Sequence, residues 1–343
     1  MPHYKLAFLG FGNVGQALAR LLLRKRAELE SRYTITFSVT GLATGRHGAA
    51  LDPEGIALEQ ALALASSGES LTGLSRGPVP GGAAEFIRAA QADVLFENTP
   101  VNYETGQPAI DHLRTALEAG QHAITANKGP VVHAYNELKA LAAAQGRRFY
   151  FESTVMDGAP IFSLYREALP AAGLHAFRGI LNSTTNLILT RMEAGETFEQ
   201  AVAHAQSIGI AETDPSGDVD GWDAAIKVAA LVTVMMGLPL NPGDVTRRGI
   251  REITPEAIAE ARAQGKRWKL VCTAARTDEG VDAQVGPEMV AADSPLYGVE
   301  GTTSIIQFET DVLGLLSVIE ANPSPDTTAY GLLADFINAV RGI

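Results

Sequence analysis

The chain has 343 residues, of which 46% are hydrophobic and 19% charged. This length exceeds one comfortable hydrophobic core and predicts an ordinary globular protein of two domains. The formal net charge of −12 and the lack of clustered Lys and Arg exclude a nucleic-acid partner, because phosphate binding needs such clusters. No signal peptide and no apolar stretch of membrane-spanning length is recognisable, so we expect a cytoplasmic protein without a membrane partner.

Short apolar runs alternate with segments of helical periodicity through the first 150 residues. This alternation predicts right-handed βαβ units, and so an α/β fold with a Rossmann-type, doubly wound parallel sheet in a dinucleotide-binding domain of residues 1–150. The expected strands are residues 4–9, 34–42, 92–96 and 122–125, and the expected helices are residues 14–29, 108–119 and 134–145.

After about residue 151 the pattern changes to that of an α+β domain with its own sheet, which we expect to span residues 151–325. The expected elements are a strand at 176–181, a helix from 184, a helix opened by the capping box Thr197–Gln200, a long apolar helix at 221–236 and several strands within 265–320. A last helix at 328–340, within a terminal segment of about 326–343, is expected to pack back on the first domain. The single cysteine, Cys272, is interpreted as a buried strand residue, and the scattered histidines do not indicate a transition-metal site.

A glycine-rich turn, Gly10-x-Gly12-x-x-Gly15, lies directly between the first expected strand and helix. The first glycine permits a tight turn, the second lets backbone approach a pyrophosphate, and the third lets the helix pack closely on the strand. In this context the turn predicts a dinucleotide site; the alternative is a structural turn that binds nothing. The residues assigned to cofactor binding here are Gly10, Phe11, Gly12, Asn13, Val14 and Gly15.

The end of the second expected strand carries no acid of the kind that holds the ribose hydroxyls of NAD. It leads instead into a segment that contains Thr44, Arg46 and His47, which could bind a 2′-phosphate. This favours NADP over NAD, although Arg46 could equally be a solvated loop residue.

Polar residues also follow two later strands. Asn98, Thr99 and Pro100 follow Glu97 at the end of one, and Asn127 and Lys128 follow the next. Ligands bind at the carboxyl ends of strands in a doubly wound sheet, so we expect these residues near the cofactor. Lys128 could hold a carboxylate or transfer a proton, or it could simply be solvated.

An acidic loop precedes the long apolar helix and holds five acids, namely Glu212, Asp214, Asp218, Asp220 and Asp223. Asp223 and Lys227 are four residues apart, so they share one helix face. They could form an ordinary surface ion pair. However, charges at the start of a buried helix need partners or a function, which favours proton transfer in a cleft. The spacing of the acids does not fit a calcium-binding EF-hand.

Taken in order, the segments GFGNVG, ENTP, TANK, FESTVMDGAP, LNSTTNLILTRM and AETDPSGDVDGWDAAIK resemble the homoserine dehydrogenase family over nearly the whole chain. The resemblance implies an NAD(P)-dependent oxidoreductase that interconverts aspartate semialdehyde and homoserine, in the synthesis of threonine, methionine and isoleucine. It also implies a homodimer formed by the second, catalytic domain. The chain resembles short members, without the C-terminal ACT regulatory domain.

The resemblance further implies roles for individual residues. Lys227 and Asp223 would be the catalytic lysine and its partner, with Lys128 beside substrate and nicotinamide. Na⁺ or K⁺ would be held largely by backbone carbonyls. The implied substrate-binding residues are Glu212, Asp218, Asn182, Ser183 and Thr184, and the implied cation-binding residues are Glu152, Val155, Asp157 and Ala159.

The chain departs from the family pattern at Met156-Asp157, where glycines are usual, and at Ser183, which also replaces a glycine. Two alternative functions therefore stay open. One is a different amino-acid dehydrogenase on the same scaffold, admitted by a changed pocket. The other is a non-catalytic dinucleotide-binding regulator, which would not need Lys128, Asp223 and Lys227.

Overall fold

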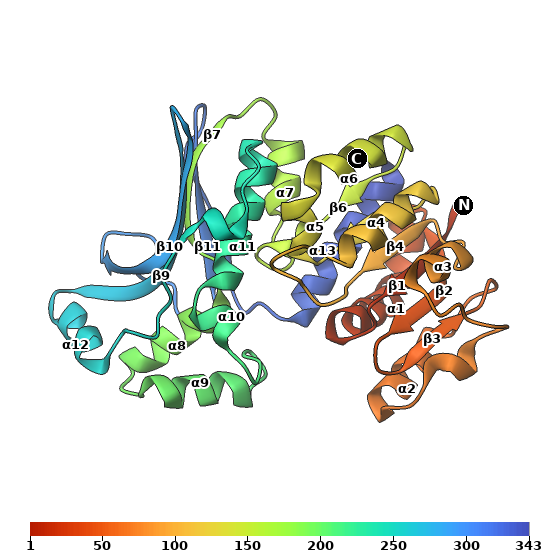
Figure 1. Cartoon of the computed structure of the whole chain (residues 1–343), viewed down its shortest axis with the longest axis horizontal. Coiled ribbons are helices and arrows are strands. Elements are labelled where there is room, and N and C mark those ends of the chain that lie inside the picture. The colour runs from red at the N-terminus through yellow and green to blue at the C-terminus, as the bar shows by residue number, and fades with distance from the viewer. Residues whose placement is uncertain (343) are drawn as a thin grey trace. The chain divides into compact units, whose positions relative to one another are not determined.

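The computed structural model describes residues 1–342 and divides into two compact units (Figure 1). Unit 1 consists of Met1–Pro160 together with Ser324–Ile343, of which residue 343 lies outside the described residues. Unit 2 consists of Ile161–Pro323. The chain thus leaves the first unit once and returns to it for the terminal helix.

Unit 1 is built on a six-stranded sheet of order β3-β2-β1-β4-β5-β6. Its strands are β1 (His3–Leu9), β2 (Thr36–Thr44), β3 (Gly48–Leu51), β4 (Val94–Glu97), β5 (His122–Thr125) and β6 (Phe149–Tyr150). All neighbours pair in parallel except β3, which runs antiparallel to β2 at the sheet edge. The strand order is that of a Rossmann fold and confirms the predicted doubly wound sheet.

Helices cover both faces of this sheet, which explains why its strands are almost continuously apolar. Leu6 and Phe8 of β1 face a core shared with α1 and the terminal helix α13, whereas Ala7 and Leu9 face a core shared with α3 and α4. The helical elements of the unit are α1 (Asn13–Tyr33), α2 (Leu58–Ser67), η1 (Leu71–Leu74), α3 (Ala83–Ala89), α4 (Ala109–Glu118), α5 (Lys128–His133), α6 (Tyr135–Ala144), η2 (Glu152–Thr154) and α13 (Pro325–Arg341).

Unit 2 contains a second six-stranded sheet, of order β12-β11-β7-β9-β10-β8. Its strands are β7 (Leu174–Ile180), β8 (Thr246–Arg247), β9 (Lys266–Thr277), β10 (Gly280–Ala291), β11 (Ser304–Thr310) and β12 (Gly314–Glu320). The helical elements are α7 (Ile161–Ser163), η3 (Leu164–Ala168), α8 (Ser183–Glu193), α9 (Phe198–Ser207), α10 (Ser216–Val219), α11 (Trp222–Leu231), η4 (Val232–Met236), η5 (Pro242–Asp244) and α12 (Pro255–Ala263). This mixed unit confirms the predicted α+β second part.

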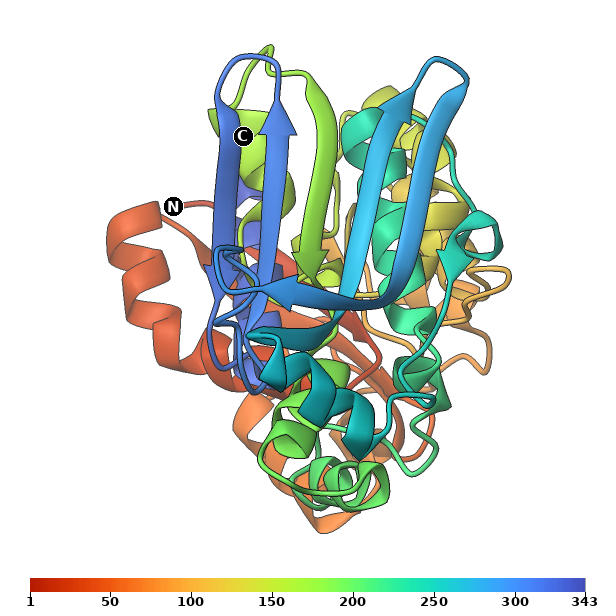
Figure 2. The same cartoon turned by 90° about the vertical axis from the view of Figure 1, so that its left-hand side faces the viewer.

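One face of the second sheet is buried beneath helices and the other is largely open. Phe177, Cys272 and Phe308 lie on the buried face. With the sheet turned towards the viewer, helices lie behind the strands and leave their upper part uncovered in front (Figure 2). On that open side Leu315 and Ile319 of β12 are 71% and 61% exposed.

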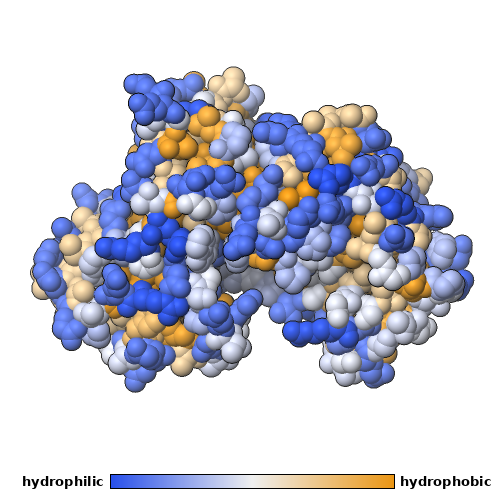
Figure 3. All heavy atoms as spheres, in the orientation of Figure 1, coloured by the Kyte–Doolittle hydropathy of each residue, from blue (hydrophilic) through white to orange (hydrophobic). Residues whose placement is uncertain are grey.

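Polar residues make up most of the molecular surface visible in Figure 3. Among residues 1–342 no helix combines the length and the apolar character needed to cross a membrane.

Candidate functional site

The glycine turn of unit 1 follows β1 and leads into α1. Each of its three glycines is suited to its position for a different reason. Gly10 has φ +103°, and a Cβ there would lie 2.4 Å from the carbonyl oxygen of Asn98. A Cβ on Gly15 would lie 2.4 Å from the carbonyl oxygen of Gly10. By contrast, a Cβ on Gly12 would meet nothing within 4 Å. The space over Gly12 is therefore free of protein atoms where a pyrophosphate would approach.

The N-terminus of α1 is available for an anion. Its N-cap, Gly12, provides no side-chain hydrogen bond, so within residues 1–342 no capping side chain covers the first N–H groups of the helix, from Asn13 onward. Phe11 anchors the turn because it is 1% exposed and packs edge-on against Phe8. The backbone N–H groups of Gly10 and Phe11 both donate to the carbonyl of Ala43, which fixes the turn beside the end of β2.

The end of β2 leads into a turn with an exposed arginine. Thr44 ends the strand, and its Oγ1 accepts the N–H groups of Arg46 and His47 at 3.0 and 2.7 Å. Arg46 is exposed and takes part in no ion pair within residues 1–342. This turn therefore offers a guanidinium and no competing carboxylate.

The ends of β4 and β5 are joined by side-chain hydrogen bonds. Asn127, which is 4% exposed, donates to the carbonyls of Thr99 and Pro100 at 3.0 and 3.3 Å and caps α5 by accepting the N–H of Gly129. Lys128, half-buried, is the first residue of α5. The loop after β4 and the start of α5 thus form one polar rim.

Asn98 stands out on this rim because its carboxamide is unsatisfied. Both Oδ1 and Nδ2 are buried, and neither has a hydrogen-bond partner within residues 1–342. Leaving a buried amide unpaired costs about 1–3 kcal/mol. A donor and acceptor pair of this kind fits a bound polar ligand, and the neighbouring glycine turn fits its phosphates.

The segment expected to hold a cation lies near the end of Met1–Pro160, the first of the two stretches of chain that form unit 1. Glu152 and Val155 are buried, and the Glu152 N–H donates to Asp335 Oδ2 at 2.8 Å. Met156 and Asp157 adopt φ +53° and +49°, the left-handed region that favours glycine. The Asp157 carboxylate accepts the Thr328 hydroxyl at 2.8 Å. No group of three or more His, Cys, Asp or Glu side chains suited to a metal occurs within residues 1–342, so a cation here would depend on backbone oxygens.

In unit 2 the side chain of Asn182 connects three chain segments. It caps α8 by accepting the N–H of Thr185 at 2.8 Å. Its Nδ2 donates to Asp218 Oδ1 at 2.7 Å and to Asp223 Oδ2 at 3.0 Å. The acidic loop and the first turn of α11 are thereby tied to the start of α8.

Asp223 and Lys227 form the ion pair that their spacing predicts. Lys227 Nζ lies 2.8 Å from Asp223 Oδ2 and donates to the carbonyl of Leu181 at 2.7 Å. Their side chains are only 15% and 12% exposed, for Lys227 and Asp223 respectively. Cys272 lies beneath them, and burial raises the pKa of its thiol to about 12, so it stays a neutral strand residue.

The ionised form of Asp218 is electrostatically disfavoured in this cluster. Burial raises the pKa of its carboxyl above the ordinary value, and the negative charge of Asp223 raises it further. Hydrogen bonds from Asn182 and Thr184 and the charge of Lys227 oppose this rise. Perturbed carboxyls beside a lysine are typical of functional sites.

The remaining substrate candidates lie at the start of α8 and in the acidic loop. Ser183 is the first residue of α8 and Thr184 donates to the carbonyl of Ile210 at 3.3 Å. Glu212 is exposed in the following loop, where its backbone carbonyl accepts Gln206 Nε2 at 3.1 Å. The structure therefore brings together Asn182, Thr184, Asp218, Asp223 and Lys227, whereas Glu212 is exposed to solvent.

Two supporting residues were assigned no role from the sequence. Glu97 is a fully buried carboxylate at the end of β4, next to Asn98. Arg247 stacks 3.7 Å over the ring of Trp222 and donates to the carbonyl of Asp220, at the start of α11. An acid at a strand end was a visible signal for Glu97. Nothing local indicated that Arg247 reaches a loop 27 residues earlier.

Comparisons with known proteins agree over nearly the whole chain. Residues 160–337 match a family model described as homoserine dehydrogenase, and residues 10–152 match one described as homoserine dehydrogenase, NAD binding domain. An NAD(+)-dependent homoserine dehydrogenase of Pseudomonas canavaninivorans is 35% identical over 98% of this chain and 96% of its own length. A homoserine dehydrogenase of Methanocaldococcus jannaschii is 36% identical over 97% of each chain.

Solved structures give the same result. A putative homoserine dehydrogenase from Archaeoglobus fulgidus superposes with a TM-score of 0.86 at 33% identity, covering 98% of both chains. A hyperthermophilic archaeal homoserine dehydrogenase in complex with NADPH superposes with a TM-score of 0.83 at 28% identity, covering 100% of this chain and 99% of that one.

Proposed function

The chain belongs to the homoserine dehydrogenase family, and from this premise we propose which of its residues bind the dinucleotide and the amino acid and which move the proton. It is an NAD(P)-dependent oxidoreductase acting on a CH–OH group, and it interconverts homoserine and aspartate semialdehyde. The bound nicotinamide supplies the hydride acceptor for oxidation of the alcohol.

The observation that carries the catalytic assignment is the buried Asp223–Lys227 pair, with Asn182 and Asp218 against it. In the oxidative direction Lys227, as the neutral amine, takes the proton of the substrate hydroxyl while the hydride leaves the carbon. In the reductive direction it returns a proton to the developing alkoxide. Asp223 and the Leu181 carbonyl hold Nζ in place for this transfer.

The acids of the same unit suit the ammonium group of the amino acid. Asp218 lies within the cluster, and we assign it to orient the substrate through its carboxylate, with Glu212 approaching the ammonium from the exposed loop. Asn182, Ser183 and Thr184 line the start of α8 next to these acids. Lys128 of unit 1 is assigned to contact substrate and nicotinamide.

The residues of unit 1 fit a dinucleotide. The open space over Gly12 and the uncapped N-terminus of α1, at Asn13, Val14 and Gly15, suit a pyrophosphate. The unsatisfied Asn98 carboxamide suits the polar groups of the nicotinamide half, with Thr99 and Pro100 beside it.

We assign the preference for NADP to Arg46, assisted by Thr44, because a guanidinium without an acidic partner attracts a 2′-phosphate. The test is the absorbance at 340 nm with homoserine and either NADP or NAD. NADP should be favoured, and Arg46→Ala should reduce the NADP-to-NAD ratio of kcat/KM by about tenfold. A ratio unchanged by this substitution would refute the assignment.

A monovalent cation, Na⁺ or K⁺, is proposed at the oxygen-rich segment that includes Glu152, Val155, Asp157 and Ala159. The fit rests on donor chemistry, since these groups offer oxygens only, which hard cations prefer. Activity should rise on adding K⁺ or Na⁺ to protein dialysed into a tetramethylammonium buffer. Equal activity in all three salts would contradict the proposal.

A homodimer is proposed through the open face of the second sheet. Leu315 and Ile319 are exposed on this face, and Arg178 and Glu288 form an ion pair on it. Large apolar side chains at an uncovered sheet face are typical of interfaces. Light scattering after gel filtration should give about twice the 36.2 kDa chain mass, and the double variant Leu315→Glu, Ile319→Glu should give the monomer mass. A monomeric unmodified protein would exclude the dimer.

A further inference from the structure

Glu97 is the feature of unit 1 that the proposed cofactor site does not yet explain. It ends β4, and its side chain is 0% exposed. A buried carboxylate costs several kcal/mol unless its oxygens receive hydrogen bonds. The groups that hydrogen-bond to the Glu97 carboxylate therefore show which parts of the chain it holds in place.

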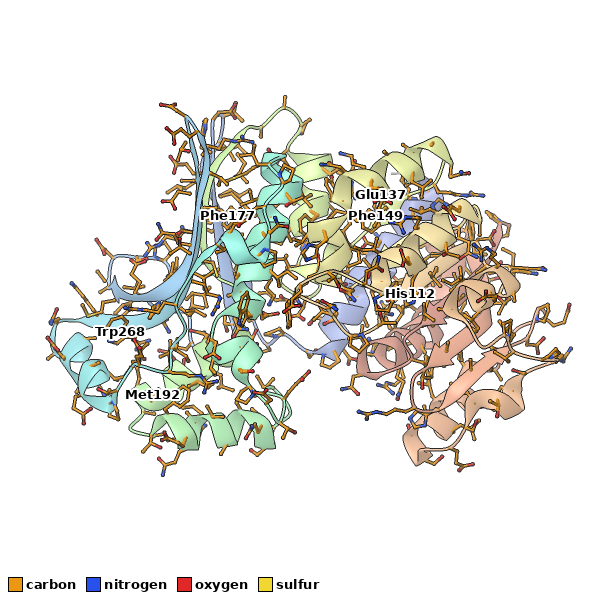
Figure 4. All side chains as sticks on the ribbon, viewed as in Figure 1. His112, Glu137, Phe149, Phe177, Met192 and Trp268 are labelled. Carbon is orange, nitrogen blue, oxygen red and sulfur yellow. The ribbon has the colours of Figure 1, made fainter. Side chains whose placement is uncertain are left out.

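All of these donors belong to elements around the carboxyl ends of β4 and β5. One carboxylate oxygen, Oε1, accepts the N–H of Thr99 at 3.2 Å and also the Thr99 hydroxyl. The hydroxyl of Thr125, the last residue of β5, lies 2.8 Å from the Glu97 backbone carbonyl and 3.0 Å from the other carboxylate oxygen, Oε2, so these two acceptors share its proton. His112 of α4, labelled in Figure 4, places Nδ1 3.4 Å from Oε1.

These bonds fix the loop that presents Asn98. The loop residue Thr99 is bound twice by Glu97, and its carbonyl accepts Asn127 Nδ2 at 3.0 Å. On the other side, the Asn98 carbonyl lies so close to Gly10 that a Cβ there would be 2.4 Å away. The loop is thus clamped between the glycine turn and the Glu97 carboxylate.

We propose that Glu97 is a positioning residue for the cofactor, which holds the Asn98–Pro100 loop so that the unsatisfied Asn98 carboxamide faces the nicotinamide half of the dinucleotide. This inference rests on the proposed cofactor site. Glu97 itself touches no ligand in this account, because its carboxylate is occupied by Thr99, Thr125 and His112. It acts by pre-organising the loop, which lowers the entropy that binding must overcome.

The test compares two carboxylates that flank the same strand. Asp93 immediately precedes β4 and accepts the N–H of Lys5 at 2.7 Å, at the opposite end of the strand from the cofactor loop. Glu97→Gln and the control Asp93→Asn each remove one charge and retain the shape of the side chain. Glutamine also replaces one acceptor oxygen with a donor, so the set of bonds to Thr99 and Thr125 cannot be kept in full.

We expect Glu97→Gln to raise the Kd of the dinucleotide by at least about fivefold, measured by quenching of protein fluorescence. The KM for homoserine should change by less than about twofold. Asp93→Asn should leave both constants unchanged even where its melting temperature falls. If Glu97→Gln yields no folded protein, Thr125→Val removes a hydroxyl donor to the same carboxylate without changing a residue assigned to the cofactor, and the cofactor Kd should rise in the same way.

Equal cofactor Kd values for the Glu97, Asp93 and unmodified proteins would overturn the positioning role. So would a loss confined to homoserine KM. Because the Kd measurement needs no turnover, it stays informative if the unmodified protein fails to oxidise homoserine. That second failure would count against the proposed function and not against the role of Glu97.

Discussion

Replacing Asp218 with asparagine should stabilise the protein and impair its activity. The side chain is buried with its pKa raised, first by burial and then by the charge of Asp223. Oxygens of both carboxylates bind the same Asn182 Nδ2, at 2.7 and 3.0 Å, so they lie at most about 6 Å apart. At an effective dielectric constant of 20, two such charges repel by about 3 kcal/mol.

Attraction between Asp218 and Lys227 offsets part of this repulsion. We therefore expect a net gain of about 1 kcal/mol in the free energy of unfolding on substitution, or about 2–4 °C in melting temperature for a unit of this size. The folded-state pKa of this acid lies above its unfolded value, so its ionisation costs stability as pH rises through that window. The gain in unfolding free energy of the Asp218→Asn protein should thus be largest at pH 8. It should shrink as the pH falls towards the ordinary pKa of an aspartate carboxyl.

The assay combines thermal unfolding at several pH values with steady-state kinetics. We expect kcat/KM for homoserine to fall at least about tenfold, while the KM of the dinucleotide stays unchanged. Asp214→Asn serves as the control from the same loop. Asp214 is exposed, and the Ser216 N–H lowers the pKa of its carboxyl, so its loss should slightly lower stability at pH 8 without changing activity. A lower melting temperature of Asp218→Asn at pH 8 would refute the reasoning.

Two further predictions concern unit 1. Gly12→Ala should keep the melting temperature of the unmodified protein, because a Cβ there meets nothing within 4 Å, but should weaken dinucleotide binding by about tenfold or more; Gly15→Ala, whose Cβ would lie 2.4 Å from a carbonyl oxygen, should instead lose stability. Fluorescence titration and thermal unfolding separate the two, and equal stability of both variants would contradict the packing argument. Burial, followed by the charges of Arg147 and Arg148, lowers the pKa of His122 to about 4. The unfolded chain therefore takes up this proton first, and stability that is full above pH 6.5 is lost as pH falls towards 4, by about 2 kcal/mol. In acid-unfolding curves, His122→Asn should remove this loss of stability and lower the pH at which half of the protein is unfolded. An unchanged midpoint pH would contradict this role of His122.

Most of the Rossmann-type sheet could be predicted because its strands are short, apolar and separated by helices of regular periodicity. The strand expected at residues 122–125 is β5 without any shift. The edge strand β3 was missed, since Gly48–Leu51 contains no β-branched residue and pairs antiparallel only through its turn from β2. The short helices α2 and α3 were also missed, because they lie in a stretch rich in alanine and glycine.

The long apolar helix expected at residues 221–236 is present, but its hydrogen-bond pattern changes along its length. The structure has α11 to Leu231 and then a π-helical turn, η4, over Val232–Met236. A segment that is apolar on all sides gives no periodicity from which a change in hydrogen-bond register could be read.

The candidate site was only partly readable for a similar reason. Asp223 and Lys227 are four residues apart on a helix, so their pairing follows from local geometry. Asn182 reaches Asp223 across 41 positions, and this contact depends on how α8 and α11 pack in unit 2. The clamp at Glu97 also spans α4, β4 and β5, and no local pattern encodes it.

The most direct test of the central claim is the rate of homoserine-dependent reduction of the dinucleotide by the unmodified protein and by Lys227→Ala, followed at 340 nm under saturating cofactor. If Lys227 carries the proton, the substitution should lower kcat by at least about a hundredfold while the Kd of the dinucleotide changes little. A loss of less than about tenfold, equivalent to ~1.4 kcal/mol of transition-state stabilisation, would contradict the assignment of Lys227.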